Sequence, residues 1–368
     1  MPIDLLLPEL FASEGGIQAY SRTLLLALRR IRPDQPLRVF IRNDCRHHLP
    51  RSGWPGITWY SCQRSSARMV ASVLWAARCR RPRLLLSTHA NFAPLQHLHH
   101  RITGTPSWCS AHGIEVWNLR AGPKRWGLRQ LQRLLPVSRF TAERISQQLG
   151  ANCPPQGLLP NSFDPQRFQP GPRPQPLLER YGLQRHQPLI FTLSRLSSFD
   201  RYKNIDALIS ALPPLLRNWP DLRLIVAGTG DDQPRLQHLA KVLGLEREVI
   251  FAGRIPDDEL PDHYRLATLF ALPSEKEGFG IVFLEALGSG LPVLAGNRDG
   301  SIDPLVSGRL GLLVDPRLPL APALASLLAR QGDPLWFQPE QLAREVAQRF
   351  GFDAFCEQLE AQLNAANL

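Results

Sequence analysis

A chain of 368 residues is too long for one ordinary hydrophobic core, which rarely exceeds about 250 to 300 residues, so we expect two domains. Hydrophobic residues make up 43% of the chain and charged residues 20%, a balance that excludes a wholly disordered protein. The formal net charge of +11 indicates an acidic partner, which could be a nucleotide diphosphate, a nucleic acid or an anionic membrane.

The N-terminal half predicts strands that alternate with helices. Apolar runs separated by a glycine-containing loop and by stretches of helical periodicity favour a parallel sheet. The expected strands are Ile3–Leu7, Leu37–Ile41 and Arg83–Ser87, the loop is 12–16, and the expected helices are Gln18–Ile31 and Ala67–Arg78. No apolar run approaches the ~20 residues that cross a bilayer.

The C-terminal half repeats this alternation more regularly, which predicts a second α/β domain. The expected strands are Pro188–Ser194, Leu222–Gly228, Val249–Gly253 and Leu269–Pro273, and the expected helices are Asn204–Leu216, Gln233–Gly244 and Asp257–Ala267. The Pro-rich and Gly-containing segment Phe168–Gln175 separates the halves. We therefore predict domains at 1–168 and 169–349, with a C-terminal helix at 350–368 that joins the first domain.

Cysteines and the N-terminus indicate the compartment. The six cysteines are scattered, with no CxxC pair and no histidine at zinc-ligand spacing, which is typical of free thiols in a reducing environment. Acidic Asp4 and Glu9 stand where a secretory signal would carry positive charge. The sequence predicts a cytoplasmic protein, and it leaves open a peripheral contact with the inner face of an anionic membrane.

The segment Glu275–Gly296, EKEGFGIVFLEALGSGLPVLAG, carries the strongest chemical signal. Glu277 and Glu285 lie eight residues apart around a Gly-Phe-Gly turn that leads into a helix. Free backbone N–H groups at the start of such a helix favour a phosphate or a developing anion. From this spacing alone, the two glutamates could equally be solvated carboxylates at a helix end.

This segment resembles the carboxylate pair of family 4 retaining glycosyltransferases, the glycosyl transferases group 1, of the GT-B type. The resemblance includes the flanking Pro273 and Ser274 and the GLPV that follows the helix. It implies a GT-B fold, in which two Rossmann-like domains with parallel sheets face each other across a cleft. The N-terminal domain would bind the acceptor and the C-terminal domain the nucleotide-sugar donor. The likeness is strong from Leu189 to Pro316 and patchier from Ile3 to Phe168.

The resemblance also implies roles for individual residues. Glu277 would accept hydrogen bonds from the donor sugar, the amides of the glycine-rich turn would hold the same sugar, and Glu285 would bind the ribose diol. Arg195 and Lys203 would neutralise the leaving diphosphate. The implied donor-binding residues are Gly16, Arg195, Lys203, Arg254, Ile255, Glu277, Gly278, Phe279, Gly280, Ile281, Val282 and Glu285, and the implied catalytic residues are His112, Glu277, Arg195 and Lys203.

The N-terminal half contributes weaker signals. Gly15 and Gly16 resemble the glycine loop of the family, where glycine permits positive φ and a close approach of the backbone. The segment WCSAHGIEVW places His112 in a loop, beside Glu115, that resembles the family segment contacting the donor sugar. Ser138 and Asn161 are further candidates. Departures from the family pattern are Asn204, where many relatives have glycine, and the variable stretch Asn43–Arg83, which we expect to hold acceptor specificity.

No Asp-x-Asp triplet occurs, so we expect metal-independent transfer, no cofactor, and no metal ligand. By resemblance, the enzyme would move a hexose, with mannose or glucose as leading candidates, from a GDP- or UDP-sugar to a glycan or a lipid-linked saccharide. Two alternatives remain, a catalytically inactive GT-B partner subunit and an NAD-dependent oxidoreductase. The latter is disfavoured because GTGDDQ at Gly228 lacks the third glycine of the dinucleotide fingerprint. Arg-rich segments between Arg68 and Arg133 suit a membrane surface, and no nucleic-acid motif is present.

Overall fold

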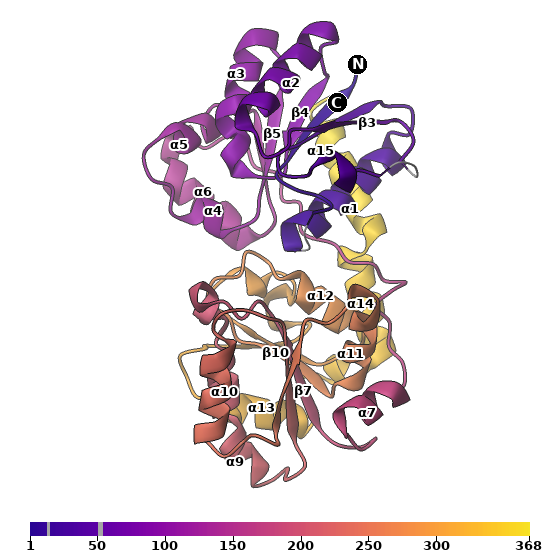
Figure 1. Cartoon of the computed structure of the whole chain (residues 1–368), viewed down its shortest axis with the longest axis vertical. Coiled ribbons are helices and arrows are strands. Elements are labelled where there is room, and N and C mark those ends of the chain that lie inside the picture. The colour runs from indigo at the N-terminus through magenta and orange to yellow at the C-terminus, as the bar shows by residue number, and fades with distance from the viewer. Residues whose placement is uncertain (13–14, 51–53) are drawn as a thin grey trace. The chain divides into compact units, whose positions relative to one another are not determined.

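The computed structural model describes residues 1–12, 15–50 and 54–368, which form two compact units (Figure 1). The first unit comprises Met1–Ser162 and Phe352–Leu368, and the second comprises Phe163–Gly351. The division after Ser162 lies slightly before the segment in which the sequence placed it. Phe163 already belongs to the second unit, where its amide donates to the carbonyl of Phe350 at 3.4 Å.

The first unit is built around a parallel sheet whose described strands are ordered β3-β2-β1-β4-β5-β6. Strands β1, β2, β4 and β5 are buried on both faces, as expected for a sheet covered by helices on each side (Figure 1). The strands are β1 (Ile3–Leu7), β2 (Leu37–Ile41), β3 (Ile57–Ser61), β4 (Leu84–Ser87), β5 (Ser107–Ala111) and β6 (Arg133–Pro136). The helices are α1 (Gly16–Ile31), α2 (Ser66–Cys79), α3 (Ala93–Thr103), α4 (Ile114–Trp117), α5 (Pro123–Leu128), α6 (Arg139–Leu149) and α15 (Phe352–Ala365), with 3-10 turns η1 (Arg46–His48), η2 (Ala90–Phe92) and η3 (Gly150–Asn152).

The second unit repeats the plan with a parallel sheet ordered β12-β11-β10-β7-β8-β9 in the described residues. Its strands are β7 (Leu189–Leu193), β8 (Arg223–Ala227), β9 (Val249–Gly253), β10 (Leu269–Leu272), β11 (Val293–Gly296) and β12 (Leu312–Val314). Its helices are α7 (Gln175–Tyr181), α8 (Ile205–Ser210), α9 (Leu212–Leu216), α10 (Gln233–Val242), α11 (Leu260–Leu266), α12 (Ile281–Gly288), α13 (Ala321–Leu328) and α14 (Pro339–Phe350), with 3-10 turns η4 (Ser198–Lys203), η5 (Asp257–Glu259), η6 (Gly300–Ile302), η7 (Val306–Gly308) and η8 (Pro334–Phe337).

Both sheets have the doubly wound order in which the first strand of the unit lies beside the fourth. In the first unit β1 pairs with β4, and in the second β7 pairs with β10. The chain reverses its direction of winding at these pairs, which leaves a crevice at the carboxyl ends of the strands where ligands bind. The topology therefore predicts that ligands bind at the loops that follow β1, β4, β7 and β10.

The C-terminal helix α15 belongs to the first unit, where it packs against α1 (Figure 1). Phe355 lies edge-on to Tyr20 at 5.8 Å between ring centroids, and Arg32 pairs with Glu360 at 2.8 Å. Chain segments from opposite ends of the sequence thus complete one core. In the described residues, no helix combines the length and the apolar character needed to cross a bilayer.

Three features of the fold differ from the sequence-based expectation. Strands β3, β5, β6, β11 and β12 were not predicted, and Glu115, placed beside His112 in a loop, belongs to α4. The helix expected at Asn204–Leu216 is broken at Ala211 into α8 and α9. The break is explained by Pro213 and Pro214, which have no amide hydrogen to continue the helical ladder.

Candidate functional site

The carboxyl edge of the second sheet brings together most of the residues that the sequence singled out. Arg195 follows β7, η4 carries Lys203, and the turn with Glu277 follows β10. Strands β7 and β10 are the neighbours at which the winding reverses. Two cations and a carboxylate therefore lie at the position where doubly wound sheets bind their ligands.

Lys203 and Glu277 form an ion pair between η4 and the turn that precedes α12. The side chains are only 15% and 14% exposed, respectively, so each charge is largely removed from water. Two backbone-mediated contacts run alongside this pair: the Glu275 amide donates to the Tyr202 carbonyl at 2.9 Å, and Asn204 Nδ2 donates to the Pro273 carbonyl at 2.8 Å. The loops after β7 and β10 are thus joined.

The buried carboxylate of Asp299 holds the Glu277 turn in place. It accepts the amide of Glu277 at 2.6 Å, the hydroxyl of Ser274 at 2.9 Å and the amide of Ser301 at 2.9 Å. Burial raises the pKa of Asp299 to about 6, although its hydrogen bonds oppose the shift. Asp299 was not predicted from the sequence; its position three residues after the buried strand β11 was the available signal.

The glycine turn has the geometry that its sequence predicts. Gly280 has φ of 88°, in the left-handed region, and a Cβ there would lie 2.5 Å from the ring of Phe283. Helix α12 begins directly after it at Ile281, followed by Val282, so the amides at the start of this helix lie at the carboxyl edge. The side chain of Phe279 is buried and packs against Phe350, which leaves its backbone as its only means of contacting a ligand.

Glu285 lies one turn into α12 and accepts a hydrogen bond from the hydroxyl of Tyr264 at 2.8 Å. Burial is the main cause that raises the pKa of Glu285 to about 7, and the hydrogen bond from Tyr264 acts in the opposite direction. Tyr264, on α11, is fully buried. It therefore orients the carboxylate, a role that the sequence analysis did not assign.

Arg195 is positioned by Asp200. The guanidinium lies 3.1 Å from the carboxylate of Asp200, which is buried while Arg195 is 80% exposed. The other oxygen of Asp200 accepts the hydroxyl of Tyr202 at 2.9 Å. The ammonium groups of Lys203 and Lys276 lie 5.6 and 5.7 Å from the centre of the Tyr202 ring. Tyr202 thus contacts the positive groups of both loops.

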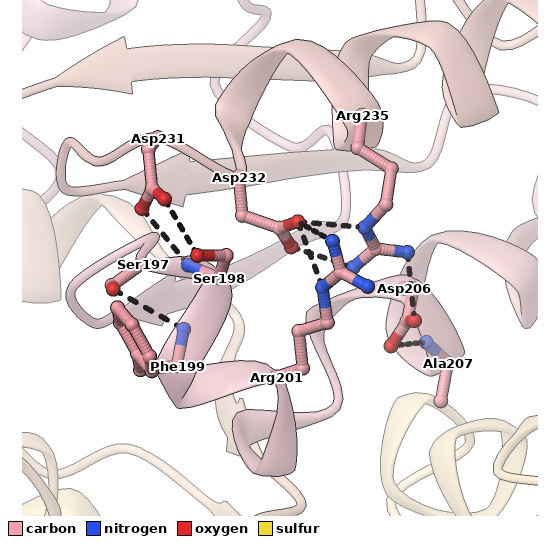
Figure 2. Close-up of polar contacts among 9 residues, drawn as sticks. All are labelled: Ser197, Ser198, Phe199, Arg201, Asp206, Ala207, Asp231, Asp232 and Arg235. Carbon is pink, nitrogen blue, oxygen red and sulfur yellow. Dashed lines mark hydrogen bonds and ion pairs between the residues drawn. The ribbon is translucent and has the colours of Figure 1, made fainter.

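A second buried carboxylate, Asp232, fixes η4 from the side (Figure 2). It accepts Nε of Arg201 at 3.0 Å, and it accepts Nε and a terminal nitrogen of Arg235 at 2.8 and 2.6 Å. Arg235 also donates to Asp206 at 3.0 Å. Arg201 thus attaches η4 to the residue that precedes α10, and Arg235 joins α10 to α8, the helix that follows η4.

The structure explains Asn204 and the glycines of GTGDDQ, which the sequence alone did not. Asn204 has φ of 57°, a left-handed conformation that asparagine tolerates better than most side chains, so it can stand where relatives have glycine. In GTGDDQ, a Cβ at Gly230 would lie 2.1 Å from the carbonyl oxygen of Leu196. This glycine therefore serves the close packing of two loops, which agrees with the missing dinucleotide fingerprint.

His112 follows β5 in the first unit, and Thr88 follows β4. The Nε2 of His112 lies 2.9 Å from the Thr88 carbonyl, and its amide donates to Glu115 at 2.6 Å. A carbonyl only accepts, so Nε2 carries the proton and Nδ1 is left as an acceptor. Burial lowers the pKa of His112, which keeps the ring neutral near pH 7. Tyr20 packs edge-on against the ring at 4.7 Å.

The remaining predicted residues have more varied settings. Gly16 is the exposed first residue of α1; Gly15 is extended, with φ of 173°, and neither glycine is in the left-handed region, so the expectation that this pair uses a left-handed φ was wrong. Ser13 and Glu14, in the predicted loop, lie outside the described residues. The hydroxyl of Ser138 caps α6 by accepting the Thr141 amide at 3.0 Å. Asn161 is buried with its Oδ1 unpaired. Arg254 and Ile255 follow β9, with Arg254 exposed, and Gly278 lies in the turn.

No group of three or more His, Cys, Asp or Glu side chains suited to hold a metal ion occurs within residues 1–12, 15–50 and 54–368. Positive charge at the carboxyl edge comes from Arg195, Lys203 and Lys276, and it is supplemented by the first turn of α12. This arrangement is suited to receive a diphosphate and a polyhydroxylated group side by side.

The sequence of the second unit matches a known family. Residues 178–335 match the family model of glycosyl transferases group 1. The GDP-mannose-dependent alpha-(1-6)-phosphatidylinositol monomannoside mannosyltransferase of Mycolicibacterium smegmatis is 37% identical over 218 residues, which cover 56% of each chain. Mannosylfructose-phosphate synthase of Agrobacterium fabrum is 32% identical over 169 residues, 43% of this chain and 36% of the relative. The chain spans about half the length of the curated relatives named here or less.

Solved structures match the whole chain. HepE of Anabaena in complex with UDP has a TM-score of 0.80 at 21% identity and covers 99% of this chain and 100% of its own. Sucrose-phosphate synthase of Thermosynechococcus elongatus has the same TM-score and identity and covers 100% of both chains. The predicted GT-B fold, with two Rossmann-like units, is confirmed.

Replacing Asp299 by Asn should loosen the Glu277 turn. The amide group would direct a donor at one of the backbone N–H groups now bonded to the carboxylate, and an unpaired buried donor costs about 1–3 kcal/mol. We expect faster hydrogen exchange at the amides of Glu277 and Ser301 and a lower unfolding temperature of the second unit. Asp221→Asn, at an exposed aspartate, is the control. Unchanged exchange at both amides would contradict the supporting role of Asp299.

Proposed function

We propose, from the premise that residues 178–335 belong to the glycosyl transferases group 1 family, that this chain is a retaining glycosyltransferase. It would move a hexose from a nucleotide diphosphate sugar to a hydroxyl of a glycan or a lipid-linked saccharide without a metal ion. The observation that carries the proposal is the Lys203–Glu277 pair at the edge where β7 and β10 meet, with Arg195 beside it.

The proposed chemistry follows from the charges at this edge. As the glycosidic bond to the diphosphate breaks, negative charge accumulates on the leaving group, and Arg195 and Lys203 would stabilise it. Glu277, once Lys203 turns to the phosphate, would accept hydrogen bonds from the sugar and fix its orientation. The acceptor hydroxyl would attack from the face that the diphosphate leaves, which retains the anomeric configuration. No residue is assigned as a covalent nucleophile.

We favour GDP-mannose as the first donor to be tested, because the relative from Mycolicibacterium smegmatis is named for its dependence on it. UDP-glucose is the second, since the structure of Anabaena HepE holds UDP. Glu285 would bind the ribose, and the backbone at Arg254 and Ile255 would contact the base. His112, neutral and with Nδ1 available, would contact the donor sugar.

The first unit also carries a surface suited to a membrane-bound acceptor. Trp75 on α2 is 63% exposed and Trp126 on α5 is 52% exposed, and α3, which packs against both helices, exposes Leu98 and Ile102. Arginines are interspersed with these side chains, as at Arg78 and Arg101. Aromatic and basic side chains together favour the interface of an anionic bilayer. We propose peripheral contact through this surface.

Loss of either partner of the ion pair should stop transfer. Lys203→Ala removes charge from the leaving group and Glu277→Ala removes the sugar acceptor, so each should lower the transfer rate by ~10²-fold or more. The measurement is release of GDP or UDP in the presence of acceptor, with a chelator present throughout. Lys241→Ala, at an exposed lysine on α10, should behave as the wild type. Normal turnover in both site variants, with unfolding transitions intact, would refute the site.

Nucleotide binding should depend on pH through Glu285. Its carboxyl has a pKa of about 7, so it becomes protonated as the pH falls and loses acceptor capacity for the ribose hydroxyls. The affinity for GDP, relative to that of Glu285→Gln, should fall by up to tenfold per pH unit below about 7. Comparing the two proteins cancels titration of the nucleotide. The hydrogen bond from Tyr264 lowers the pKa of Glu285, so Tyr264→Phe should raise this pKa and move the decline in affinity to higher pH. If the ratio of the GDP affinities of the wild type and Glu285→Gln does not change with pH, Glu285 does not bind the nucleotide.

Binding to vesicles tests the membrane surface. The chain should co-sediment with phosphatidylglycerol vesicles and much less with phosphatidylcholine vesicles, because charge and apolar insertion act together. High salt should weaken the binding through screening. The double variant Trp75→Ser, Trp126→Ser should bind weakly at low salt, whereas Leu318→Ser, at an exposed leucine of the second unit, should not differ from the wild type. Equal binding by both variants would exclude this surface.

A further inference from the structure

The second unit contains a cavity of about 540 Å³ at the amino edge of its sheet, opposite to the carboxyl edge described above. Thr268 and Pro292, which line it, directly precede β10 and β11. Strand β10 separates this amino-edge cavity from the Glu277 turn, and its four residues span roughly 13 Å. The volume lies within the ~300–1,000 Å³ typical of small-molecule sites.

The lining of the amino-edge cavity is strongly cationic. Arg173, Arg265 and Arg330 contribute to it, and Glu340 is the only acidic residue among those that line it. Arg265 pairs with Asp262. Arg173 donates to the carbonyls of Arg185 and Gln187 at 3.0 and 2.6 Å and to the hydroxyl of Thr268 at 2.7 Å, all of them neutral acceptors.

Arg330 is likewise not neutralised. It donates to the carbonyl of Phe337 at 3.1 Å, and its guanidinium lies 5.0 Å from the centre of the Phe337 ring. In the described part of the chain neither Arg173 nor Arg330 has a carboxylate partner. Two uncompensated positive charges at one cavity favour an anionic ligand.

Unpaired donors point to the same class of ligand. The hydroxyl of Ser289, which lines the cavity, is buried in a residue that is only 5% exposed and has no hydrogen-bond partner. The Nε of Arg265 is also buried without a partner. Buried donors are nearly always bonded, so these two indicate a missing acceptor with several oxygens. Ser289 directly follows α12 and is held in place by that helix.

Apolar side chains also line the cavity. Trp336 is buried, and its indole nitrogen donates to the Arg309 carbonyl at 2.9 Å, which fixes the plane of the ring. Phe337, Leu291 and Leu327 complete this apolar lining. A cavity lined both by guanidinium groups and by aromatic and aliphatic side chains suits a ligand with a charged head and a ring or apolar body.

We propose that the amino-edge cavity is a second binding site, distinct from the donor site, for a small phosphate ester. Guanidinium groups and a serine hydroxyl present several donors to a tetrahedral phosphate, which accepts more hydrogen bonds than a carboxylate. The apolar lining receives the body of the ester. The inference does not depend on the proposed transferase activity.

Titration of the full chain with phenyl phosphate, glucose 6-phosphate and inorganic phosphate, followed by calorimetry, tests the proposal. At least one ester should bind saturably and more tightly than inorganic phosphate. Arg330→Gln should weaken it by about tenfold, as expected for a charged hydrogen bond, and Ser289→Ala should weaken it several-fold. Arg217→Gln, at an exposed arginine outside the cavity, should leave it unchanged. Phenyl phosphate and glucose 6-phosphate distinguish an aromatic from a saccharide body.

An excess of GDP should not displace the ester. Displacement would place the ester in the donor site and overturn the proposal, as would equal affinity in Arg330→Gln and Arg217→Gln, or no saturable binding by either ester. Equal affinity for inorganic phosphate would overturn the role given to the apolar lining. If GDP itself does not bind, the proposed transferase function fails, while the comparison of the two arginine variants still decides the cavity.

Discussion

The ion pair between Lys203 and Glu277 sets the arrangement of the carboxyl edge of the second unit. It joins two loops that follow different strands, and both side chains are largely withdrawn from water. Removing charges from water costs more than their attraction returns in many proteins, so such a pair contributes little to net stability. The ion pair instead fixes geometry, because each charge pairs with the other and the two loops are held in one relative position. The same charges can later be used by a phosphate and a sugar hydroxyl.

Each half of this pair rests on a buried carboxylate that no motif identifies. Asp299 holds the Glu277 turn through backbone amides, whereas Asp232 holds η4 through the guanidinium groups of Arg201 and Arg235. The electrostatic consequences differ. Burial raises the pKa of Asp299, while the hydrogen bond with Arg235 is the main cause that lowers the pKa of Asp232. A rigid edge is the common result, and rigid placement is what transition-state stabilisation requires.

The alternation of strands and helices in both units and the charged residues of the site were predictable, because periodicity indicates the first and a dense motif carries the second. Residues such as Asp299 and Tyr264 were not, since their partners are far apart in sequence and lie on other elements. Strand β5 was missed because SWCSA has none of the apolar run that marked β1 or β4. The reverse error occurred at Gly15 and Gly16, where a glycine-loop motif suggested positive φ, whereas Gly15 is extended and neither residue is in the left-handed region.

The net charge of +11 alone could not identify a binding partner, because arginines with different neighbours have different roles. Arg201 and Arg235 are neutralised by Asp232 and hold loops together. Arg195 is mostly exposed at an edge where a ligand can reach it. Among the residues that the structure describes, the hydrogen-bond acceptors of Arg173 and Arg330 around the cavity are all neutral. The hydrogen-bond and ion-pair partners of each guanidinium group, more than the net charge of the chain, therefore decide whether that positive charge stabilises the fold or is available to bind an anion.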